Sequence, residues 1–217
     1  MTAALLSAEG LSFGWPGRPL FRHWSHAFGP GLTWVQGGNG SGKTTLLKLL
    51  AGALTPAAGT LRCRGIAAHE APLDYRRQLF WSGAEPIAFG HLKPAEYFDF
   101  IAGLYPTLQP QALPGWVEAL GLTPFLGRRI DQLSTGSGRK LGLCVALAVG
   151  TPVLLLDEPL AALDLRSARV VSQALAALAD DGSRCCIVTS HEPLGSAEAR
   201  AQRLDLDALL ADGGYSR

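Results

Sequence analysis

The 217-residue sequence has no excess of charge of either sign. Lys and Arg together number 19 and Asp and Glu number 18, which leaves a formal net charge of +1. A dedicated nucleic-acid-binding surface is typically strongly basic, so we expect no nucleic-acid partner. Charged residues make up 17% of the chain, where about 25% is usual, and this composition argues against a disordered chain or a coiled coil.

The sequence also has few cysteines and no Cys-X-X-Cys pair. Its four cysteines are Cys63, Cys144, Cys185 and Cys186. They are too few for a disulfide scaffold in a chain of this size, so a reducing compartment is the default expectation. The opening MTAALLSAEG has no basic segment ahead of an apolar stretch, so we expect no secretory signal there.

No apolar run is long enough to cross a bilayer. The most apolar stretch, from Leu141 to Leu156, is interrupted by Thr151 and Pro152, and a spanning helix needs about 20 apolar residues. The length exceeds the typical domain size of about 150 residues. We therefore expect one large domain that carries an inserted lobe.

A strand, a glycine-rich loop and a helix follow one another near the N-terminus. Side chains alternate from Leu20 to Phe28, and a second extended segment covers Leu32 to Gln36. That segment runs into GGNGSGKTT, and leucines at helical spacing then predict a helix from Thr44 to Ala53.

Further elements follow in the rest of the chain. We predict strands at Gly59–Arg64, Gln78–Ser82, Val153–Asp157 and Arg184–Ser190, and helices at Pro94–Leu104, Trp116–Leu120, Ser167–Ala179 and Leu204–Ala211. Val153–Asp157 is apolar up to its last residue, as a strand covered on both faces should be.

The glycine-rich loop matches the pattern G-x-x-x-x-G-K-[ST]. Backbone N–H groups of such a loop converge on phosphate oxygens, Lys43 reaches the outer phosphates, and the Thr44 hydroxyl is offered to Mg²⁺. The alternative is a glycine-rich turn with a surface lysine. The candidate nucleotide-binding residues are Gly37, Gly38, Asn39, Gly40, Ser41, Gly42, Lys43, Thr44 and Thr45.

Two acids end the apolar strand that begins at Val153. In a parallel α/β sheet the carboxyl ends of the strands are where ligands bind. Asp157 is a candidate Mg²⁺ ligand, through water, and Glu158 a candidate general base that activates the attacking water. The alternative is that Asp157 only caps a turn.

Three further segments lie around these two motifs. Leu133-Ser134-Thr135-Gly136-Ser137 precedes Asp157, Leu163-Asp164 follows it closely, and His191 comes after the apolar pair Ile187-Val188. In this order, and with LLLDEP intact, residues 5–195 resemble the ATP-binding cassette ATPase, the nucleotide-binding subunit of ABC transporters.

The resemblance implies an α/β fold. It consists of a P-loop NTPase core of the ABC type, with an N-terminal antiparallel β subdomain and an inserted α-helical subdomain. Residues 1–217 would form a single nucleotide-binding domain, in which about 1–85 and 136–217 make up the core with the β subdomain and about 86–135 the helical subdomain.

The resemblance also implies roles for residues outside the two motifs. Trp15 falls where the family stacks an aromatic ring on adenine; Phe13 is the competing candidate, and either ring could instead be core. Ser134 and Gly136 resemble the signature motif, which contacts the γ-phosphate bound by the opposite subunit. Asp164 resembles the residue that bridges the two cassettes.

His191 resembles the switch histidine, which in the family contacts the γ-phosphate. The resemblance thus implies three residues with catalytic roles, which are Lys43, Glu158 and His191. Without the resemblance, a lone histidine after a strand is more often a surface or core residue.

The sequence departs from the family pattern at two places. Thr135 and Ser137 replace the first glycine and the Gln of the signature, which puts turnover in doubt but not nucleotide binding. The family also has a Gln in the segment that enters the helical lobe, where this chain has none. Glu85 is a candidate substitute as a Mg²⁺ ligand, and an exposed loop carboxylate is the alternative.

By resemblance, the protein binds ATP and Mg²⁺, dimerises around two ATP molecules and hydrolyses them to power a separate membrane-spanning subunit. It would pair with a copy of itself or with a second cassette, in the cytoplasm on the inner face of the cell membrane. The short chain and compact lobe are similar to the haem-export type of the family. Aromatic residues of the lobe could dock the membrane subunit or form core; they are Phe89, Tyr97, Phe98, Phe100 and Tyr105.

Two other functions fit the same motifs. One is a soluble ABC-type switch without a transporter, although such relatives usually join two cassettes or carry basic arms. The other is a degenerate cassette that binds ATP while its partner hydrolyses it.

Overall fold

The computed structural model describes residues 4–211. Its strands are β1 (Leu6–Trp15), β2 (Arg18–Phe28), β3 (Gly31–Gln36), β4 (Ala58–Cys63), β5 (Ile66–Ala67), β6 (Leu79–Ser82), β7 (Val153–Asp157), β8 (Cys185–Thr189) and β9 (Ala201–Asp205). Its helices are α1 (Lys43–Leu50), α2 (Pro72–Arg77), α3 (Pro94–Leu104), α4 (Leu113–Ala119), α5 (Thr135–Ala148), α6 (Leu165–Asp181) and α7 (Leu206–Ala211).

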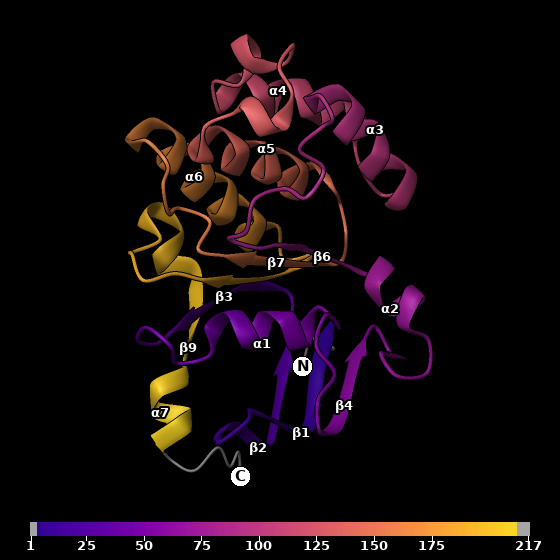
Figure 1. The fold of residues 1–217 in the computed structure, drawn as a ribbon. Coiled ribbons are helices and arrows are strands. Elements are labelled where there is room, and N and C mark those ends of the chain that lie inside the picture. The colour runs from indigo at the N-terminus through magenta and orange to yellow at the C-terminus, as the bar shows by residue number, and fades with distance from the viewer. Residues whose placement is uncertain (1–3, 212–217) are drawn as a thin grey trace.

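The strands form two separate sheets. The first is antiparallel with the order β2-β1-β4-β5, and the second is parallel with the order β6-β7-β8-β3-β9. Helix α1 lies between the sheets, and α5 and α6 lie on the other side of the parallel sheet (Figure 1). The predicted α/β class, with an antiparallel N-terminal sheet, is confirmed.

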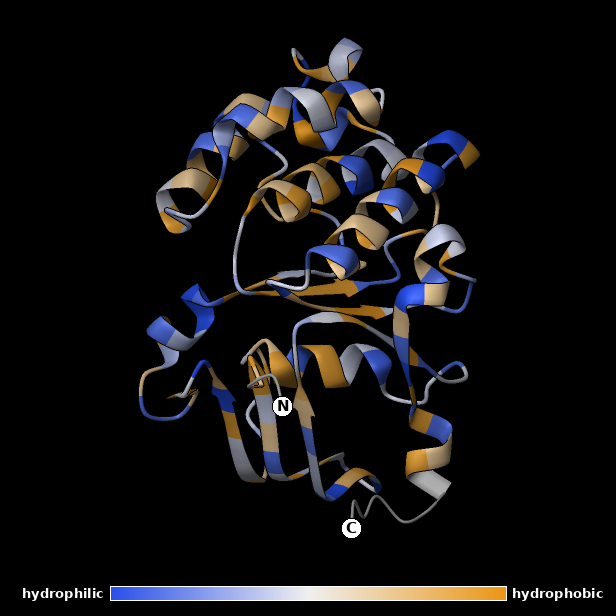
Figure 2. Ribbon diagram, turned by 180° about the vertical axis from the view of Figure 1, so that it is seen from behind, coloured by the Kyte–Doolittle hydropathy of each residue, from blue (hydrophilic) through white to orange (hydrophobic). Residues whose placement is uncertain are grey.

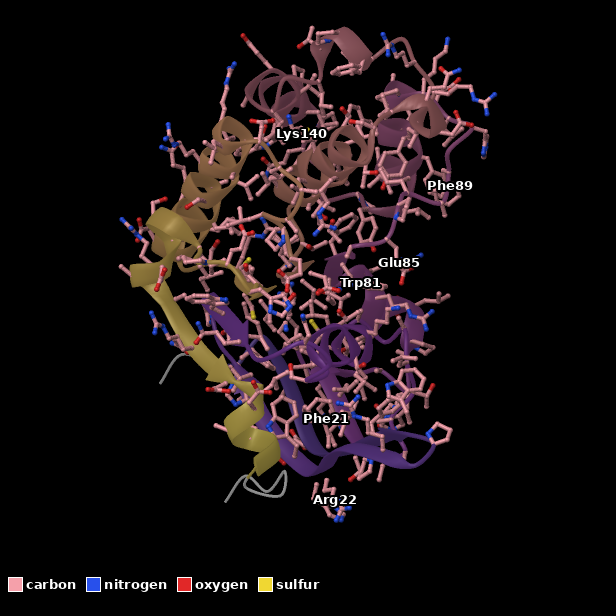
Figure 3. All side chains as sticks on the ribbon, turned by 60° about the vertical axis from the view of Figure 1, so that its left-hand side comes forward. Phe21, Arg22, Trp81, Glu85, Phe89 and Lys140 are labelled. Carbon is pink, nitrogen blue, oxygen red and sulfur yellow. The ribbon has the colours of Figure 1, made fainter. Side chains whose placement is uncertain are left out.

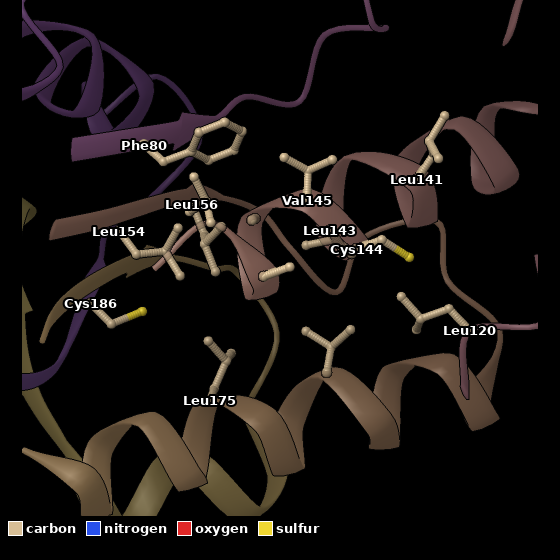
Figure 4. Close-up of a cluster of buried hydrophobic side chains, with 14 of the residues drawn as sticks. Phe80, Leu120, Leu141, Leu143, Cys144, Val145, Leu154, Leu156, Leu175 and Cys186 are labelled. Atoms are coloured by element: carbon tan, nitrogen blue, oxygen red, sulfur yellow. The ribbon is translucent and has the colours of Figure 1, made fainter. Parts of the chain in front are cut away.

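Each central strand of the parallel sheet is buried on both faces. Val153 and Leu155 of β7 belong to the buried cluster that joins α1 to the antiparallel sheet. Leu154 and Leu156 point the other way, toward α5 and α6, where Figure 4 shows them near Val145 and Leu175. The strands are therefore uniformly apolar (Figure 2), because neither face meets water.

Most predicted elements are confirmed, with ends that differ by a few residues. These are β2, β3, β4, β6, β7 and β8 among the strands and α1, α3, α4 and α6 among the helices. The four cysteines, which were not expected to form a disulfide scaffold, are free and buried. In residues 4–211 we find no helix of sufficient length and apolar character for a membrane crossing.

The predicted helix over Leu204–Ala211 is wrong in its first part. Leu204 lies in β9 and pairs with Val35 of β3, so the chain adds an edge strand before it turns into α7. The Asp205 Oδ1 atom accepts the N–H groups of Asp207 and Ala208, at 2.9 and 3.1 Å. This cap starts the helix two residues later than the apolar spacing suggests.

Several elements had no clear signal in the sequence, among them β1, α2 and α5. β1 contains two glycines and its register with β2 shifts three times, which breaks the side-chain alternation. α2 is only 6 residues long. α5 is almost entirely buried beyond its first turns, so it carries no polar stripe that marks a helix.

Helices α3 and α4 lie at the end of the molecule farthest from β1 and β2 (Figure 1). Their side chains nevertheless join the main core, because Tyr97, Ile101 and Val117 belong to the same buried cluster as Leu154. The helical subdomain boundary at about 86–135 stays a prediction.

We expect Leu155→Ala to lower the free energy of unfolding by about 2–5 kcal/mol, because the side chain is fully buried between α1 and the parallel sheet. Urea denaturation measures the change. Leu165→Ala is the matched control, since Leu165 is 80% exposed and its loss should cost no more than about 0.5 kcal/mol. Equal losses in the two variants would contradict the assigned core.

Candidate functional site

The glycine-rich loop joins the carboxyl end of β3 to the first residue of α1. Gly40 and Gly42 have φ angles of +77° and +99°, in a region that side chains with a Cβ rarely occupy. At Gly37 a Cβ atom would lie 2.5 Å from the Ser41 Oγ atom. The loop thus needs glycine at these positions to close tightly ahead of the helix N-terminus.

The Lys43 ammonium is held inside the loop. The residue is 6% exposed, and its Nζ atom donates to the carbonyls of Gly37 and Gly38 at 2.8 and 3.1 Å. The same Nζ atom lies 3.2 Å from the Nε2 atom of His191. A buried cation at a helix N-terminus makes this loop a strong site for an anion.

Asp157 connects three elements through its carboxylate. The Thr44 hydroxyl of α1 donates to Oδ2 at 2.7 Å, and the Thr189 hydroxyl of β8 donates to Oδ1 at 2.6 Å. Asp157 itself is 1% exposed at the end of β7. Both hydroxyls compensate the carboxylate for its loss of water.

Glu158 has a left-handed backbone conformation, with φ at +50°. Its N–H group donates to the Thr189 carbonyl at 3.0 Å and to the Thr189 hydroxyl at 3.1 Å. The carboxylate faces His191, whose backbone N–H donates to Oε2 at 3.1 Å and whose Nε2 atom is 3.3 Å from Oε1. Oε1 is buried and makes no hydrogen bond within residues 4–211.

Most of the loop, together with Glu158 and His191, surrounds one cavity of about 350 Å³. The residues that line it are Trp15, Arg18, Leu20, Asn39, Gly40, Ser41, Gly42, Lys43, Thr44, Thr45, Glu158 and His191. Trp15 is 48% exposed at the rim, and its ring forms a T-shaped pair with the Phe13 ring at 5.3 Å between centroids. The structure therefore brings together the loop, Trp15, Glu158 and His191 as the sequence predicts.

The sequence reasoning missed two residues of this region. Arg18 Nη2 donates to the Gly40 carbonyl at 2.7 Å, which places a second cation beside the loop and at the cavity. Asp207 Oδ2 accepts the Gly38 N–H group at 2.7 Å and ties α7 to the loop. The short spacing from Trp15 could have suggested Arg18, whereas no local pattern points to Asp207.

The structure does not bring Glu85 to Thr44 and Asp157. The Glu85 carboxylate is 73% exposed and pairs with Lys48 Nζ of α1 at 2.9 Å. Lys48 Nζ also lies 5.7 Å from the centre of the Trp81 ring. In Figure 3, Trp81, Glu85 and Phe89 follow one another along one side of the molecule, between the sheet and the helical end.

A Mg²⁺ ion fits only part of the predicted ligand set. The Thr44 hydroxyl and the Asp157 carboxylate are oxygen ligands of the kind Mg²⁺ prefers, and they already contact each other. Residues 4–211 contain no group of three or more His, Cys, Asp or Glu side chains that could hold a metal. The donors present suit an ion that takes its other ligands from water and phosphate.

Residues 29–161 match the family described as ABC transporter. The chain belongs to the ABC transporter family. This ABC protein is 34% identical to the cytochrome c biogenesis ATP-binding export protein CcmA of Escherichia coli (strain K12), over 89% of its length and 92% of the relative's. The CcmA of Shigella dysenteriae serotype 1 is 33% identical with the same coverage. The protein is accordingly an ATPase subunit of the ABC transporter family, similar to the CcmA proteins.

Solved structures support the fold of this ABC ATPase. An ATP-binding subunit of an ABC transporter superposes with a TM-score of 0.84 at 20% identity, over 98% of this chain and 95% of that one. An ATP-binding cassette solved as a post-hydrolysis dimer with ADP and Pi has a TM-score of 0.74 at 18% identity, over 92% and 93% of the two chains.

The signature residues of this ABC ATPase lie apart from its own phosphate loop. The Ser134 hydroxyl caps α5 by accepting the Ser137 N–H group at 3.2 Å and lies 3.1 Å from the Ser137 hydroxyl. A Cβ atom at Gly136 would lie 3.1 Å from the Ala162 carbonyl oxygen. Ser134 and Gly136 do not line the cavity at Lys43.

Asp164 also lies outside that cavity, at the N-terminus of α6. Its carboxylate accepts from Lys140 Nζ at 2.5 Å and from the Ser167 N–H group at 2.8 Å. The Lys140 ammonium and then the Ser167 hydrogen bonds hold the pKa of Asp164 well below its usual range. Asp164 is thus ionised and anchored at neutral pH, beside the signature helix.

We expect Thr189→Val to lower the free energy of unfolding by about 1.5–3 kcal/mol, because it removes a hydrogen bond to the buried carboxylate of Asp157. Thr189→Ser keeps the hydroxyl and loses one methyl group, at a cost of about 1 kcal/mol. Chemical denaturation compares the two variants. A Val variant as stable as the Ser variant would show that this hydrogen bond does not stabilise the fold.

Proposed function

We propose that this protein binds ATP with Mg²⁺ in the cavity at Lys43, dimerises around two nucleotides and hydrolyses them to drive a separate membrane-spanning export subunit. The observation that carries the proposal is the meeting of Lys43, Glu158 and His191 at the carboxyl end of the parallel sheet. The His191 Nε2 atom lies 3.2 Å from Lys43 Nζ and 3.3 Å from Glu158 Oε1. Lys43 and Glu158 line the same cavity, so a cation for the phosphates and a carboxylate for the water lie around one space.

Nucleotide binding uses the loop and the exposed ring at its rim. The phosphates lie over the N-terminus of α1, where loop N–H groups and the Lys43 ammonium stabilise their charge. Arg18 adds a second cation next to Gly40. The adenine stacks on the exposed Trp15 ring, which is also in a T-shaped contact with the Phe13 ring.

The Thr44 hydroxyl and the Asp157 carboxylate hold the Mg²⁺ ion, which neutralises charge on the outer phosphates when bound. Both side chains are already hydrogen-bonded to each other at 2.7 Å, so little reorganisation is needed. Glu85 is not part of this set, because its carboxylate is paired with Lys48.

Hydrolysis needs a water molecule aimed at the γ-phosphorus. The Oε1 atom of Glu158, which accepts no hydrogen bond within residues 4–211, accepts one from that water and takes its proton. The water oxygen forms a bond to phosphorus while the bond to the bridging oxygen of ADP breaks, so the products are ADP and phosphate. His191, at 3.3 Å from Oε1, is placed to contact the γ-phosphate and the carboxylate together.

A second cassette completes each site in this proposal. Ser134 and Gly136 of one copy reach the γ-phosphate held by the other copy, which is consistent with their absence from the cavity at their own loop. Leu165, which follows Asp164, is 80% exposed and gives this surface an apolar contact. The dimer is formed either by two copies of this chain or by this chain and a related cassette.

The membrane-spanning subunit docks on the helical end of the molecule. Phe89 and Phe100 are each 37% exposed, and their tilted rings lie 4.5 Å apart between centroids. Leu104, nearby in sequence, is 50% exposed. Tyr97 is buried, whereas Phe98 and Tyr105 are half-buried against the core. Only some of the aromatic residues predicted for docking are therefore available to a partner.

The relatives named as cytochrome c biogenesis export proteins indicate the process. We propose that this chain powers export in cytochrome c biogenesis, from the cytoplasmic face of the membrane. A degenerate cassette remains the second candidate, because Ser137 stands where the family has Gln and engages the Ser134 hydroxyl.

Glu158→Gln should lower kcat for ATP hydrolysis by about 10²- to 10⁴-fold, because the amide accepts no proton, while the Kd for Mg-ATP changes little. The variant should accumulate as an ATP-bound dimer in size-exclusion chromatography with light scattering. Lys43→Ala, which loses the phosphate contact, is the control for activity and binding.

Two outcomes contradict parts of this proposal. Wild-type hydrolysis no faster than that of Lys43→Ala, even with the membrane partner present, would exclude the active ATPase and favour the degenerate cassette. A Glu158→Gln variant that stays monomeric at saturating ATP would exclude the nucleotide sandwich.

Trp15→Ala should raise the Kd for ATP by about 5- to 150-fold, since base stacking is worth about 1–3 kcal/mol. Phe13→Ala is the matched control, because Phe13 touches Trp15 but does not line the cavity. Fluorescence titration with an ATP analogue measures both. A larger loss in the Phe13 variant would assign the stacking ring to Phe13.

A further inference from the structure

Arg139 makes a set of contacts that the proposed chemistry does not use. It lies on α5, and its guanidinium donates to three backbone carbonyls on two other segments. Nη1 donates to Gly83 at 2.5 Å, and Nη2 donates to Glu158 at 2.5 Å and to Asp157. One planar group thus joins the segment after β6 to the carboxyl end of β7.

Burial makes this cation costly. Desolvation lowers the pKa of Arg139, while the carboxylates of Asp157 and Glu158 raise it, and a guanidinium stays protonated in proteins. Its Nε atom is buried with no hydrogen-bond partner within the described residues. A buried charge is tolerated only where its contacts compensate for the lost water, so the three carbonyls are essential to its placement.

The contacts matter because Glu158 is strained. Its φ of +50° costs about 1–3 kcal/mol for a residue with a Cβ atom and persists only when the surroundings hold it. Thr189 accepts the Glu158 N–H group, and Arg139 and Ala161 donate to the Glu158 carbonyl. The backbone is therefore held on both sides of the Cα atom, which directs the carboxylate toward His191.

The hydrogen bond from Arg139 to Gly83 connects the guanidinium to the segment that leads to the helical end. Gly83 follows β6, at the start of the segment that leads to α3, and Glu85 of the same segment is anchored to α1 by Lys48. Gly83 and Arg139 line a cavity of about 540 Å³. A displacement of this segment relative to β7 would pull the guanidinium away from Glu158.

We propose that Arg139 is a positioning residue for ATP hydrolysis. It holds the strained backbone of Glu158 and links that backbone to the segment entering the helical end. The proposal rests on the proposed ATPase function. Arginine suits the role because its rigid fork reaches carbonyls on two segments at once, which the single ammonium of a lysine does not.

The test compares Arg139→Ala and Arg139→Lys with Arg169→Ala, in the full chain. Arg169 is exposed on α6, so its variant removes the same charge without touching Glu158. Each variant is measured for kcat and KM of ATP hydrolysis and for the Kd of a fluorescent ATP analogue. Thermal unfolding of each variant checks that it is folded.

We expect kcat to fall by about 10²-fold in Arg139→Ala, as a misplacement of about 1 Å produces, with KM and Kd within about threefold of wild type. The kcat of Arg139→Lys should stay close to that of Arg139→Ala, and the kcat of Arg169→Ala should equal that of wild type. The proposal would be overturned if Arg139→Lys had the kcat of wild type, or if the Kd of Arg139→Ala rose by as large a factor as its kcat fell. Either result would show that Arg139 has a structural role only.

Amide hydrogen exchange provides a readout that does not need turnover. In Arg139→Ala, exchange should quicken by about tenfold or more at Gly83–Ile87 and Glu158–Ala161, and not in α7. Unchanged exchange at both segments would overturn the proposal even if wild type is active. If exchange is faster in Arg139→Ala but the wild-type protein does not hydrolyse ATP, the link from Arg139 to the two segments is supported. The proposed ATPase function is then the part that is contradicted.

Discussion

The hydrogen-bonded carboxylate of Asp157 is the interaction on which the site depends. It is buried at the end of β7 and receives hydroxyl groups from α1 and β8. An unpaired carboxylate at this depth would be strongly unfavourable, so the three elements must meet in one register for the charge to be tolerated. The same register places the phosphate loop beside Glu158, because this loop leads directly into α1.

The second constraint is the burial of the parallel sheet on both faces. β7 and β8 contribute alternate residues to two hydrophobic clusters, one against α1 and one against α5 and α6. This double burial makes the strand ends rigid, and rigid ends can hold a strained residue such as Glu158. The packing that stabilises the core therefore also fixes the orientation of the Glu158 carboxylate.

Sequence patterns were reliable where one short segment determines its own conformation. The loop from Gly37 to Thr44 requires glycine at left-handed positions and is followed by leucines at helical spacing, so both its shape and its chemistry could be predicted. β9 was missed because an exposed edge strand and a short helix share one stretch of sequence. Glu85 was proposed by position alone, and Lys48, from α1, pairs with it instead.

The sequence by itself determined the α/β class, the phosphate loop, the acidic strand end and the family, because each depends on neighbouring residues or on the order of motifs. The tertiary structure decided which distant groups form hydrogen bonds. These pairs are Thr189 with Asp157, Arg18 with Gly40, Asp207 with Gly38, and Arg139 with the Glu158 carbonyl. These contacts follow from sheet register and helix packing. Such long-range geometry leaves no periodic or local signal in the chain.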